Sequence, residues 1–257
     1  GISGQVGAYL AKYLLKKNYI VIGTDRRSSR SNNWRLEELN ILDKIILEDL
    51  DMTETSNLER IFKKFAINEV YNLAAQSFVK SSFENPIQTV ISIIDFCYDN
   101  KVRVIVNPAP AVCLPADVLN KIWMITPNES ELELLTDISV NNKFSAIEAS
   151  RKLINSGIEN CIVTLGDKGS MWLSSNGVFE FSIPAIKAID TTAAGDVFNG
   201  CLAHCVLNKI PLKSAIVKAH TAASFSVTKK GAQTSIPNDQ EISSFSKNFN
   251  VQVIQHN

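Results

Sequence analysis

The chain has 257 residues, of which 45% are hydrophobic, so it can bury a sizeable core in one large or two small domains. Its 26 basic residues balance its 26 acidic residues, which argues against a net field that would attract nucleic acid or a membrane surface. No apolar run approaches the roughly 20 residues of a transmembrane helix, and no basic-then-apolar leader is visible. Five irregularly spaced cysteines argue against a disulfide framework, so we expect a cytoplasmic protein. The sequence does not predict its oligomeric state.

The first predicted elements are a glycine-rich turn, a helix and a strand. The turn has the pattern Gly-x-x-Gly-x-x-Gly over residues 1–7, the helical pattern covers Ala8–Lys17, and the apolar strand covers Tyr19–Gly23. This order is typical of dinucleotide-binding folds, in which the turn brings a phosphate to a helix start. Arg26 and Arg27 follow the acidic end of the strand and favour the 2′-phosphate of NADP.

Two more strands are predicted before residue 90, at Lys44–Glu48 and Glu69–Leu73, and polar residues follow each of them. The stretch from Gly1 to about Thr89 resembles the amino-terminal part of the GDP-mannose 4,6-dehydratases, which are extended short-chain dehydrogenase-type enzymes. The resemblance implies a partial NADP-binding Rossmann segment over residues 1–90 whose first strand is missing. The cofactor-binding residues that it implies are Gly1, Gly4, Gln5, Val6, Gly7, Arg26, Arg27, Ser28, Asp49, Leu50, Leu73, Ala75, Gln76 and Ser77.

Dehydratase (lyase) activity is not predicted for this segment. The family's catalytic Tyr-x-x-x-Lys does not follow it. Tyr13 and Lys17 have that spacing, but they lie on the helix after the turn, where they are most simply (i, i+4) neighbours. NADP is therefore an alternative ligand without the chemistry that would use it.

One sheet is predicted to continue across the middle of the chain. Pro86 can open a helix, and apolar residues then recur at helical spacing up to Cys97. Together with the strand at Glu69–Leu73 and a strand at Val102–Asn107, this helix makes a β-α-β unit whose strands would lie parallel. We therefore expect one continuous sheet, with a second domain over residues 91–257.

Later elements also alternate between helix and strand, with further strands predicted at Met124–Thr126, Cys161–Leu165, Met171–Ser174 and Val178–Ser182. Continuous apolar strands between amphipathic helices predict an α/β three-layer sandwich with a mostly parallel, doubly wound sheet. Ser145 and Glu148 fit a capping box at the start of a helix that ends near Asn155. Asn176-Gly177 favours a hairpin turn, and residues 248–257 are either an edge strand or a frayed tail.

The most informative run is Asp-Thr-Thr-Ala-Ala-Gly-Asp-Val-Phe-Asn-Gly, from Asp190 to Gly200. Its small residues let the backbone approach a phosphate, and the start of the helix that follows offers free N–H groups and partial positive charge. Asp196 would lie in the first turn of this helix, within reach of a substrate hydroxyl. This equipment is typical of phosphoryl transfer, and the alternative is an ordinary loop before a buried helix.

From about Ile94 to about Phe245 the chain resembles the ribokinase (PfkB-type) family of carbohydrate kinases. The resemblance rests on the run just described and on four further segments, which are Asn107–Pro110, Thr126–Glu131, Val163–Gly169 and Lys230–Gln233. The resemblance covers the carboxy-terminal half of the family's sequence. The amino-terminal half, which supplies most of the family's contacts with the sugar, has no recognisable counterpart in this chain. The resemblance implies ATP-dependent phosphoryl transfer to a sugar hydroxyl, with magnesium and potassium ions, on a fold that is half Rossmann-like and half ribokinase-like.

The resemblance also implies residue roles. Asp196 would be the general base, and the amides of Ala193, Ala194 and Gly195 would form the anion hole. The implied ATP-binding residues are Asn128, Glu131, Thr164, Gly166, Asp167, Lys168, Gly169 and His220, with Glu131 reaching magnesium through water. The implied monovalent-cation residues are Asp190, Thr192, Ser226, Lys229, Gly231 and Ser235. A helix cap for Asn128 and Glu131, and a structural role for His220, are the alternatives.

Three functional interpretations therefore remain open. The first is the catalytic half of an ATP-dependent sugar kinase, which binds a nucleotide and a sugar but for which efficient turnover is not expected from this chain alone. The second is an NADP-binding dehydratase fragment, and the third is a catalytically silent chimeric scaffold. The first has the most complete set of site residues.

Overall fold

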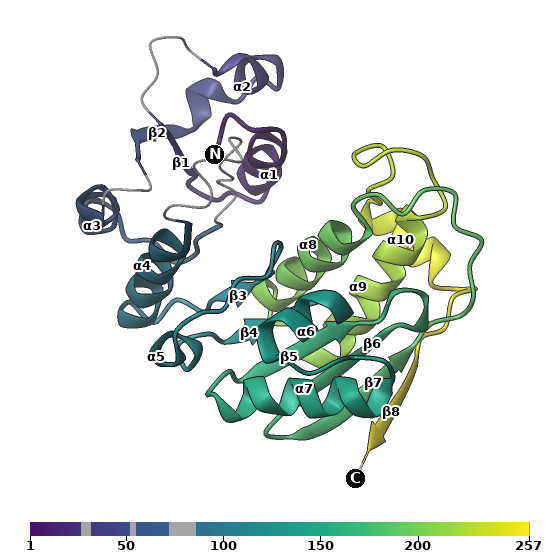
Figure 1. Cartoon of the computed structure of the whole chain (residues 1–257). Helices are drawn as coiled ribbons and strands as arrows, with labels where there is room; N and C mark the ends of the chain where they lie inside the picture. Colours follow the sequence, from purple (N-terminus) through teal and green to yellow (C-terminus); the bar gives the residue numbers. More distant parts are fainter. Residues whose placement is uncertain (27–31, 52–54, 72–85, 257) are drawn as a thin grey trace. The chain divides into compact units, whose positions relative to one another are not determined.

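The computed structural model describes residues 1–26, 32–51, 55–71 and 86–256 (Figure 1). The chain divides into two units, Gly1–Arg103 and Val104–Asn257. The boundary predicted between residues 90 and 91 falls inside helix α4 (Pro86–Asp99). We describe each unit separately.

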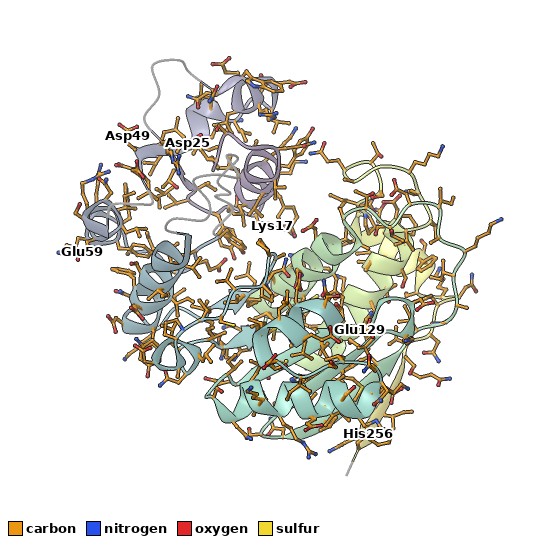
Figure 2. All side chains as sticks on the ribbon, viewed as in Figure 1. Lys17, Asp25, Asp49, Glu59, Glu129 and His256 are labelled. Carbon is orange, nitrogen blue, oxygen red and sulfur yellow. The ribbon has the colours of Figure 1, made fainter. Side chains whose placement is uncertain are left out.

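Unit 1 (Gly1–Arg103) begins with the turn and helix expected from its glycine pattern. Its elements in chain order are α1 (Gln5–Lys16), β1 (Ile22–Asp25), α2 (Trp34–Glu38), η1 (Leu42–Lys44), β2 (Ile46–Asp49), α3 (Thr55–Lys64) and α4. Strands β1 and β2 pair in parallel, so Asp25 lies opposite Asp49 where both strands end, and Figure 2 labels both side chains. Ala8, Ala11 and Leu36 are buried in the core that α1 and α2 share with the sheet.

The third strand predicted in unit 1 does not form in the part that the structure describes. Residues 69–71 are not in a strand, and the rest of the predicted strand lies outside the described residues. None of these three residues is buried, and Tyr71 is 38% exposed, whereas a strand inside a parallel sheet is covered on both faces. The described strands form two sheets, one in each unit, so the part of the chain that the structure describes does not support the expectation of one continuous sheet.

Unit 2 (Val104–Asn257) contains a mixed six-stranded sheet. Its strands, in spatial as well as chain order, are β3 (Ile105–Val106), β4 (Met124–Ile125), β5 (Asn160–Thr164), β6 (Ser170–Ser174), β7 (Gly177–Ser182) and β8 (Gln252–His256). The first three are parallel, and β5 to β8 pair antiparallel. The prediction of a mostly parallel sheet was therefore wrong for this unit, because the short connections after β5 and β6 reverse the chain and cannot cross over.

Helices cover both faces of this sheet. In chain order they are α5 (Ala116–Leu119), α6 (Glu129–Thr136), α7 (Lys143–Asn155), η2 (Gly166–Lys168), α8 (Ala194–Leu207), α9 (Leu212–Ser226) and α10 (Asp239–Phe245). Figure 1 shows α6 and α7 on one face and α8 and α9 on the other, which gives unit 2 three layers. Ile162 and Phe181 of the sheet lie in one core cluster with Phe198 of α8 and Ile216 of α9.

Local signals were accurate at the hairpin but not at one helix start. Gly177 has a φ of 119° in the tight β6–β7 turn, as the Asn-Gly pair predicted. The capping box of α7 is formed by Asn142 and Ser145, so the expected pair of Ser145 and Glu148 was wrong by one helical turn. No helix of the described residues is long and apolar enough to cross a membrane.

Candidate active site

The start of α8 is the centre of the candidate site. Ala193 occupies the N-cap position with a φ of 64°, in the left-handed region, and makes no side-chain cap hydrogen bond. Ala194 donates its N–H to the carbonyl oxygen of Thr191 at 3.2 Å, and Val197 donates to that of Ala193 at 2.9 Å. The first-turn N–H groups between them have no side-chain cap, so they are available to an anion.

Space beside this helix start is open. A Cβ atom added to Gly195 would meet no other atom within 4 Å, so packing does not require glycine at this position. Asp196 lies in the same first turn, and its side chain is exposed. The structure therefore brings together uncapped donors, an unobstructed approach and a carboxylate, as the sequence run predicted.

Asp190 anchors the segment that leads into α8. Its Oδ1 accepts a hydrogen bond from the N–H of Thr192 at 3.0 Å, and its Oδ2 accepts one from the N–H of Gly231 at 2.9 Å. Hydrogen bonds from Thr192 and then from the Gly231 N–H hold the pKa of Asp190 at about 2. Since Gly231 is 41 residues away in sequence, this carboxylate joins two loops that the cation-site prediction also pairs.

The other predicted cation-site residues are engaged in local contacts. Ser226 is buried and donates to the carbonyl of Ala223 at 2.8 Å, and Ser235 donates to that of Ala232 at 3.3 Å. Lys229 pairs with Glu241 of α10 at 2.8 Å. The described residues contain no cluster of three His, Cys, Asp or Glu side chains that could hold a metal ion, so a monovalent ion here would depend on main-chain carbonyls.

Asn128 and Glu131 form a capping box at the start of α6. Glu131 accepts from the Asn128 N–H at 2.8 Å, and Asn128 Oδ1 accepts from the Glu131 N–H at 2.8 Å. The helix-cap alternative is thus the geometry that the structure shows. Asn128 also bridges to Thr164 at the end of β5, which places two of the predicted nucleotide segments side by side at the carboxyl ends of parallel strands.

Residues 166–169 form a short loop between β5 and β6 that favours glycine at position 166 and requires it at position 169. Gly166 has a φ of 59° and Gly169 a φ of 101°, both in the left-handed region. A Cβ on Gly169 would lie 1.8 Å from the carbonyl oxygen of Phe181, so no side chain fits there. Asp167 and Lys168 are exposed in this loop.

His220 lies in the core of unit 2. It is 4% exposed, it forms a hydrogen bond of 2.7 Å with Ser170 Oγ, and its ring is tilted by 58° against that of Phe198 with ring centroids 4.9 Å apart. Burial lowers the pKa of His220 to about 4, so the ring is neutral at physiological pH. This environment favours the structural alternative over a contact with the adenine base.

A model of the pfkB family of carbohydrate kinases matches residues 45–239, which include all of the α8 site and its neighbouring loops. The chain belongs to this family. The ribokinase of Haemophilus influenzae is 42% identical over 163 residues, which are 63% of this chain and 53% of that protein. The deoxyribokinase of Salmonella typhimurium is 35% identical over 190 residues, covering 71% of this chain and 61% of that protein.

Solved structures extend the likeness in fold. The structure of Arabidopsis thaliana ribokinase complexed with ribose and ATP matches with a TM-score of 0.71 and 22% identity, over 95% of this chain and 87% of that one. In sequence, this pfkB-family chain spans about half to three fifths of the length of the two curated relatives.

Unit 1 retains the geometry of a glycine-rich turn. A Cβ on Gly7 would lie 2.4 Å from the carbonyl oxygen of Gly1, and Ser3 Oγ donates to the carboxylate of Asp25. Leu50 donates its N–H to the Asp25 carbonyl at 2.9 Å, just after Asp49. The turn is therefore tight and bonded to the end of β1, as in the predicted cofactor segment.

The rest of that predicted cofactor segment is not supported. Arg27, Ser28, Leu73, Ala75, Gln76 and Ser77 lie outside the described residues. The comparisons give no support to a dehydratase-like part or to a chimera, and the pfkB family model begins at residue 45, inside the segment that resembles the dehydratases. Lys17 Nζ lies 5.7 Å from the ring centre of Tyr13, as expected of helical neighbours.

One residue near the site received no role from the sequence. Asn199 of α8 donates from Nδ2 to the carbonyl of Gly195 at 3.0 Å, while its Oδ1 is buried without a hydrogen-bond partner among the described residues. Its spacing of three residues from Asp196 was the signal that could have identified it, because residues three apart are neighbours on a helix.

Proposed function

We propose that unit 2 is the ATP-binding and catalytic half of a sugar kinase, which transfers the terminal phosphoryl group of ATP to a sugar hydroxyl. The observation that carries this proposal is the start of α8, where uncapped N–H groups, open space at Gly195 and the exposed Asp196 carboxylate share one helical turn. Few structural explanations require all three together, whereas phosphoryl transfer needs each of them.

Each part of this helix start would have a separate task. Asp196 would orient the sugar hydroxyl and accept its proton as the new O–P bond forms. The N–H groups of Gly195 and Asp196 would face the charge that spreads over the phosphoryl oxygens while the bond to ADP breaks, whereas the Ala194 N–H is engaged by the Thr191 carbonyl. These donors are fixed before substrate binds, so they need no reorganisation during the reaction.

The nucleotide and ions would be held by the neighbouring loops. Thr164 and residues 166–169 would contact ATP at the end of β5, and Glu131 would reach Mg²⁺ through water, since its side chain is otherwise engaged in the α6 cap. A potassium ion would lie near the Asp190–Gly231 contact, held by carbonyl groups. The relatives' names, ribokinase and deoxyribokinase, favour a pentose as the acceptor.

The direct test is Asp196→Asn. We expect this change to lower ribose or deoxyribose phosphorylation by at least about 100-fold, since general-base catalysis contributes about 10²–10⁴-fold, while ATP affinity changes little. Asp117→Asn is the matched control, because Asp117 is an exposed aspartate on α5 outside the site. Equal activity of the Asp196→Asn and wild-type proteins in a coupled ADP-release assay would contradict the base assignment.

NADPH is the comparison ligand for ATP, because the glycine-rich turn at the start of α1 predicted a dinucleotide and the comparisons give that prediction no support. Thermal unfolding in the presence of ATP–Mg²⁺ or NADPH separates the two. A ligand at 100 times its Kd should stabilise the protein by about 2.7 kcal/mol. The kinase proposal expects stabilisation by ATP–Mg²⁺, and stabilisation by NADPH alone would reverse the ranking.

A further inference from the structure

The amide of Asn199 is oriented by a single bond. Its Nδ2 donates to the Gly195 carbonyl at 3.0 Å, and its Oδ1 is buried without a partner in the described parts of the chain. The Gly195 oxygen can only accept, so exchanging the two ends of the amide would bring two acceptors together. The unpaired atom is therefore the oxygen, and the bond to Gly195 determines where the amide points.

Asn199 is also an unfavourable choice for its position. Asparagine has a lower helix propensity than alanine or leucine, and a buried acceptor without a donor reduces folding stability. Packing alone gives no reason for it, because a hydrophobic side chain would avoid both penalties. The bond to Gly195 is what the amide adds that an apolar residue would not.

That bond acts on the proposed anion hole through one peptide unit. The carbonyl of Gly195 and the N–H of Asp196 belong to the same planar peptide, so restraining the oxygen also fixes the direction of the N–H. Gly195 benefits from a restraint beyond those of the helix itself, because it has no side chain, an added Cβ would meet no atom outside its own stretch of helix within 4 Å, and glycine has more backbone freedom than other residues.

We propose that Asn199 is a positioning residue that holds the Gly195–Asp196 peptide so that the Asp196 N–H stays directed at the transferred phosphoryl group. This inference rests on the proposed function of the α8 site. It explains why a polar amide occupies this place on the helix, and it assigns no contact between Asn199 and the substrate. A hydrogen-bond donor that is already oriented before the substrate binds lowers the activation barrier more than a donor that must be reoriented during the reaction.

The same helix provides a matched control. Asn208, at the other end of α8, donates from Nδ2 to the His204 carbonyl at 2.7 Å, which is the same (i, i−4) bond away from the site. A conservative rescue is also available, since serine hydroxyls donate to (i−4) carbonyls elsewhere in this chain, from Ser156 to Lys152 at 2.9 Å and from Ser243 to Asp239 at 2.7 Å.

The experiment compares Asn199→Ala, Asn199→Ser and Asn208→Ala in ATP-dependent ribose phosphorylation. Loss of an oxyanion donor costs about 10²–10³-fold in kcat, so loss of a residue that only directs one should lower kcat by about tenfold. We expect this for Asn199→Ala with both KM values within about twofold of wild type, partial recovery in Asn199→Ser, and an unchanged kcat in Asn208→Ala. An unchanged kcat in Asn199→Ala, or an equal loss in Asn208→Ala, would overturn the inference.

A binding measurement keeps this test separate from the proposed function. ADP with magnesium and aluminium fluoride mimics the migrating phosphoryl group, and its effect on thermal unfolding does not require turnover. If the wild type phosphorylates no sugar, the proposed function fails. The positioning role still stands if Asn199→Ala binds this mimic at least fivefold more weakly, with ADP binding unchanged. Equal mimic binding by Asn199→Ala and wild type, or no binding to either, overturns it.

Discussion

Each unit has a helix with glycine in its first turn, but the two glycines serve different purposes. In the first turn of α1, Gly7 is required by packing, because a Cβ there would lie 2.4 Å from the Gly1 carbonyl oxygen. At α8, neither Gly195 nor Gly200 is required by packing, because an added Cβ would meet nothing within 4 Å. The Cβ position of Gly7 in α1 is blocked by the backbone of its own turn, whereas the space beside Gly195 in α8 is open.

This difference shows how far a glycine pattern can be interpreted. A glycine that avoids a clash with its own turn is explained by the fold and gives no independent information about a ligand. A glycine beside open space at an uncapped helix start is not explained by the fold, so the approach of a ligand becomes the better explanation. The comparison therefore ranks the α8 site above the α1 turn on structural grounds alone.

The largest expected effect is on activity, from Gly195→Ala. The added methyl group would occupy the space through which the phosphoryl group approaches, so we expect turnover to fall by about 100-fold, as when one oxyanion donor is lost. Stability should instead rise by about 0.5–1 kcal/mol, because alanine is the better helix residue. Gly200→Ala, on the same helix, should give the stability gain and keep full turnover, as measured by kinetics and thermal unfolding.

The opposite pattern is expected for Gly7→Ala. The clash with the Gly1 carbonyl should destabilise unit 1 by about 1–3 kcal/mol, the usual cost of overpacking. Native-state hydrogen exchange of the α1 amides measures this locally, without assuming that the two units unfold together. If Gly7→Ala protected α1 as well as the wild type does, the contrast between the two helix starts would be lost.

Ala193→Gly should have a smaller effect. Alanine in the left-handed region destabilises the folded state by about 1–2 kcal/mol, and glycine removes this strain. Glycine also gives the unfolded chain more conformational entropy, which lowers the folding stability by about 0.4–1 kcal/mol. We therefore expect stability to rise by at most about 1 kcal/mol, with activity retained, in urea unfolding and kinetic assays. A loss of stability would show that the N-cap of α8 is not strained.

The smallest effect concerns pH. Asp190 has a pKa of about 2 in the folded protein and about 3.8 as the ordinary value, so folding favours its charged form. Its contribution to stability is complete above about pH 4 and is lost as the pH falls to about 2. The difference in urea midpoint between wild type and Asp190→Asn should shrink over this window, and a constant difference would contradict the assignment.

Sequence patterns predicted the start of α8 because its signals are local. The order of Ala193, Ala194, Gly195 and Asp196 determines a helix start by its own chemistry, and Asn176-Gly177 determines a turn in the same way. The N-cap of α7 was predicted at the wrong residue because Asn142 and Ser145 both belong to residue types that cap helices, so the pattern alone does not choose between them.

Long-range features were out of reach for a related reason. The strand expected at residues 69–73 has apolar members, but whether it pairs depends on partners elsewhere in the chain. Strand β8 could be assigned only once its pairing with β7 was seen, from Val178 opposite His256 to Ser182 opposite Gln252. The role of Asn199 likewise depends on an unpaired oxygen, which no sequence pattern displays.

The glycine at position 169 has a mechanical consequence. Because its backbone lies directly against the Phe181 carbonyl, the loop of residues 166–169 cannot slide along β7 without a collision. We therefore expect the β6–β7 hairpin and this loop to move together. The turn of the hairpin, at Asn176, is exposed. A peptide tag inserted at that turn, chosen because it is remote and accessible, would pull on the loop proposed to hold the nucleotide.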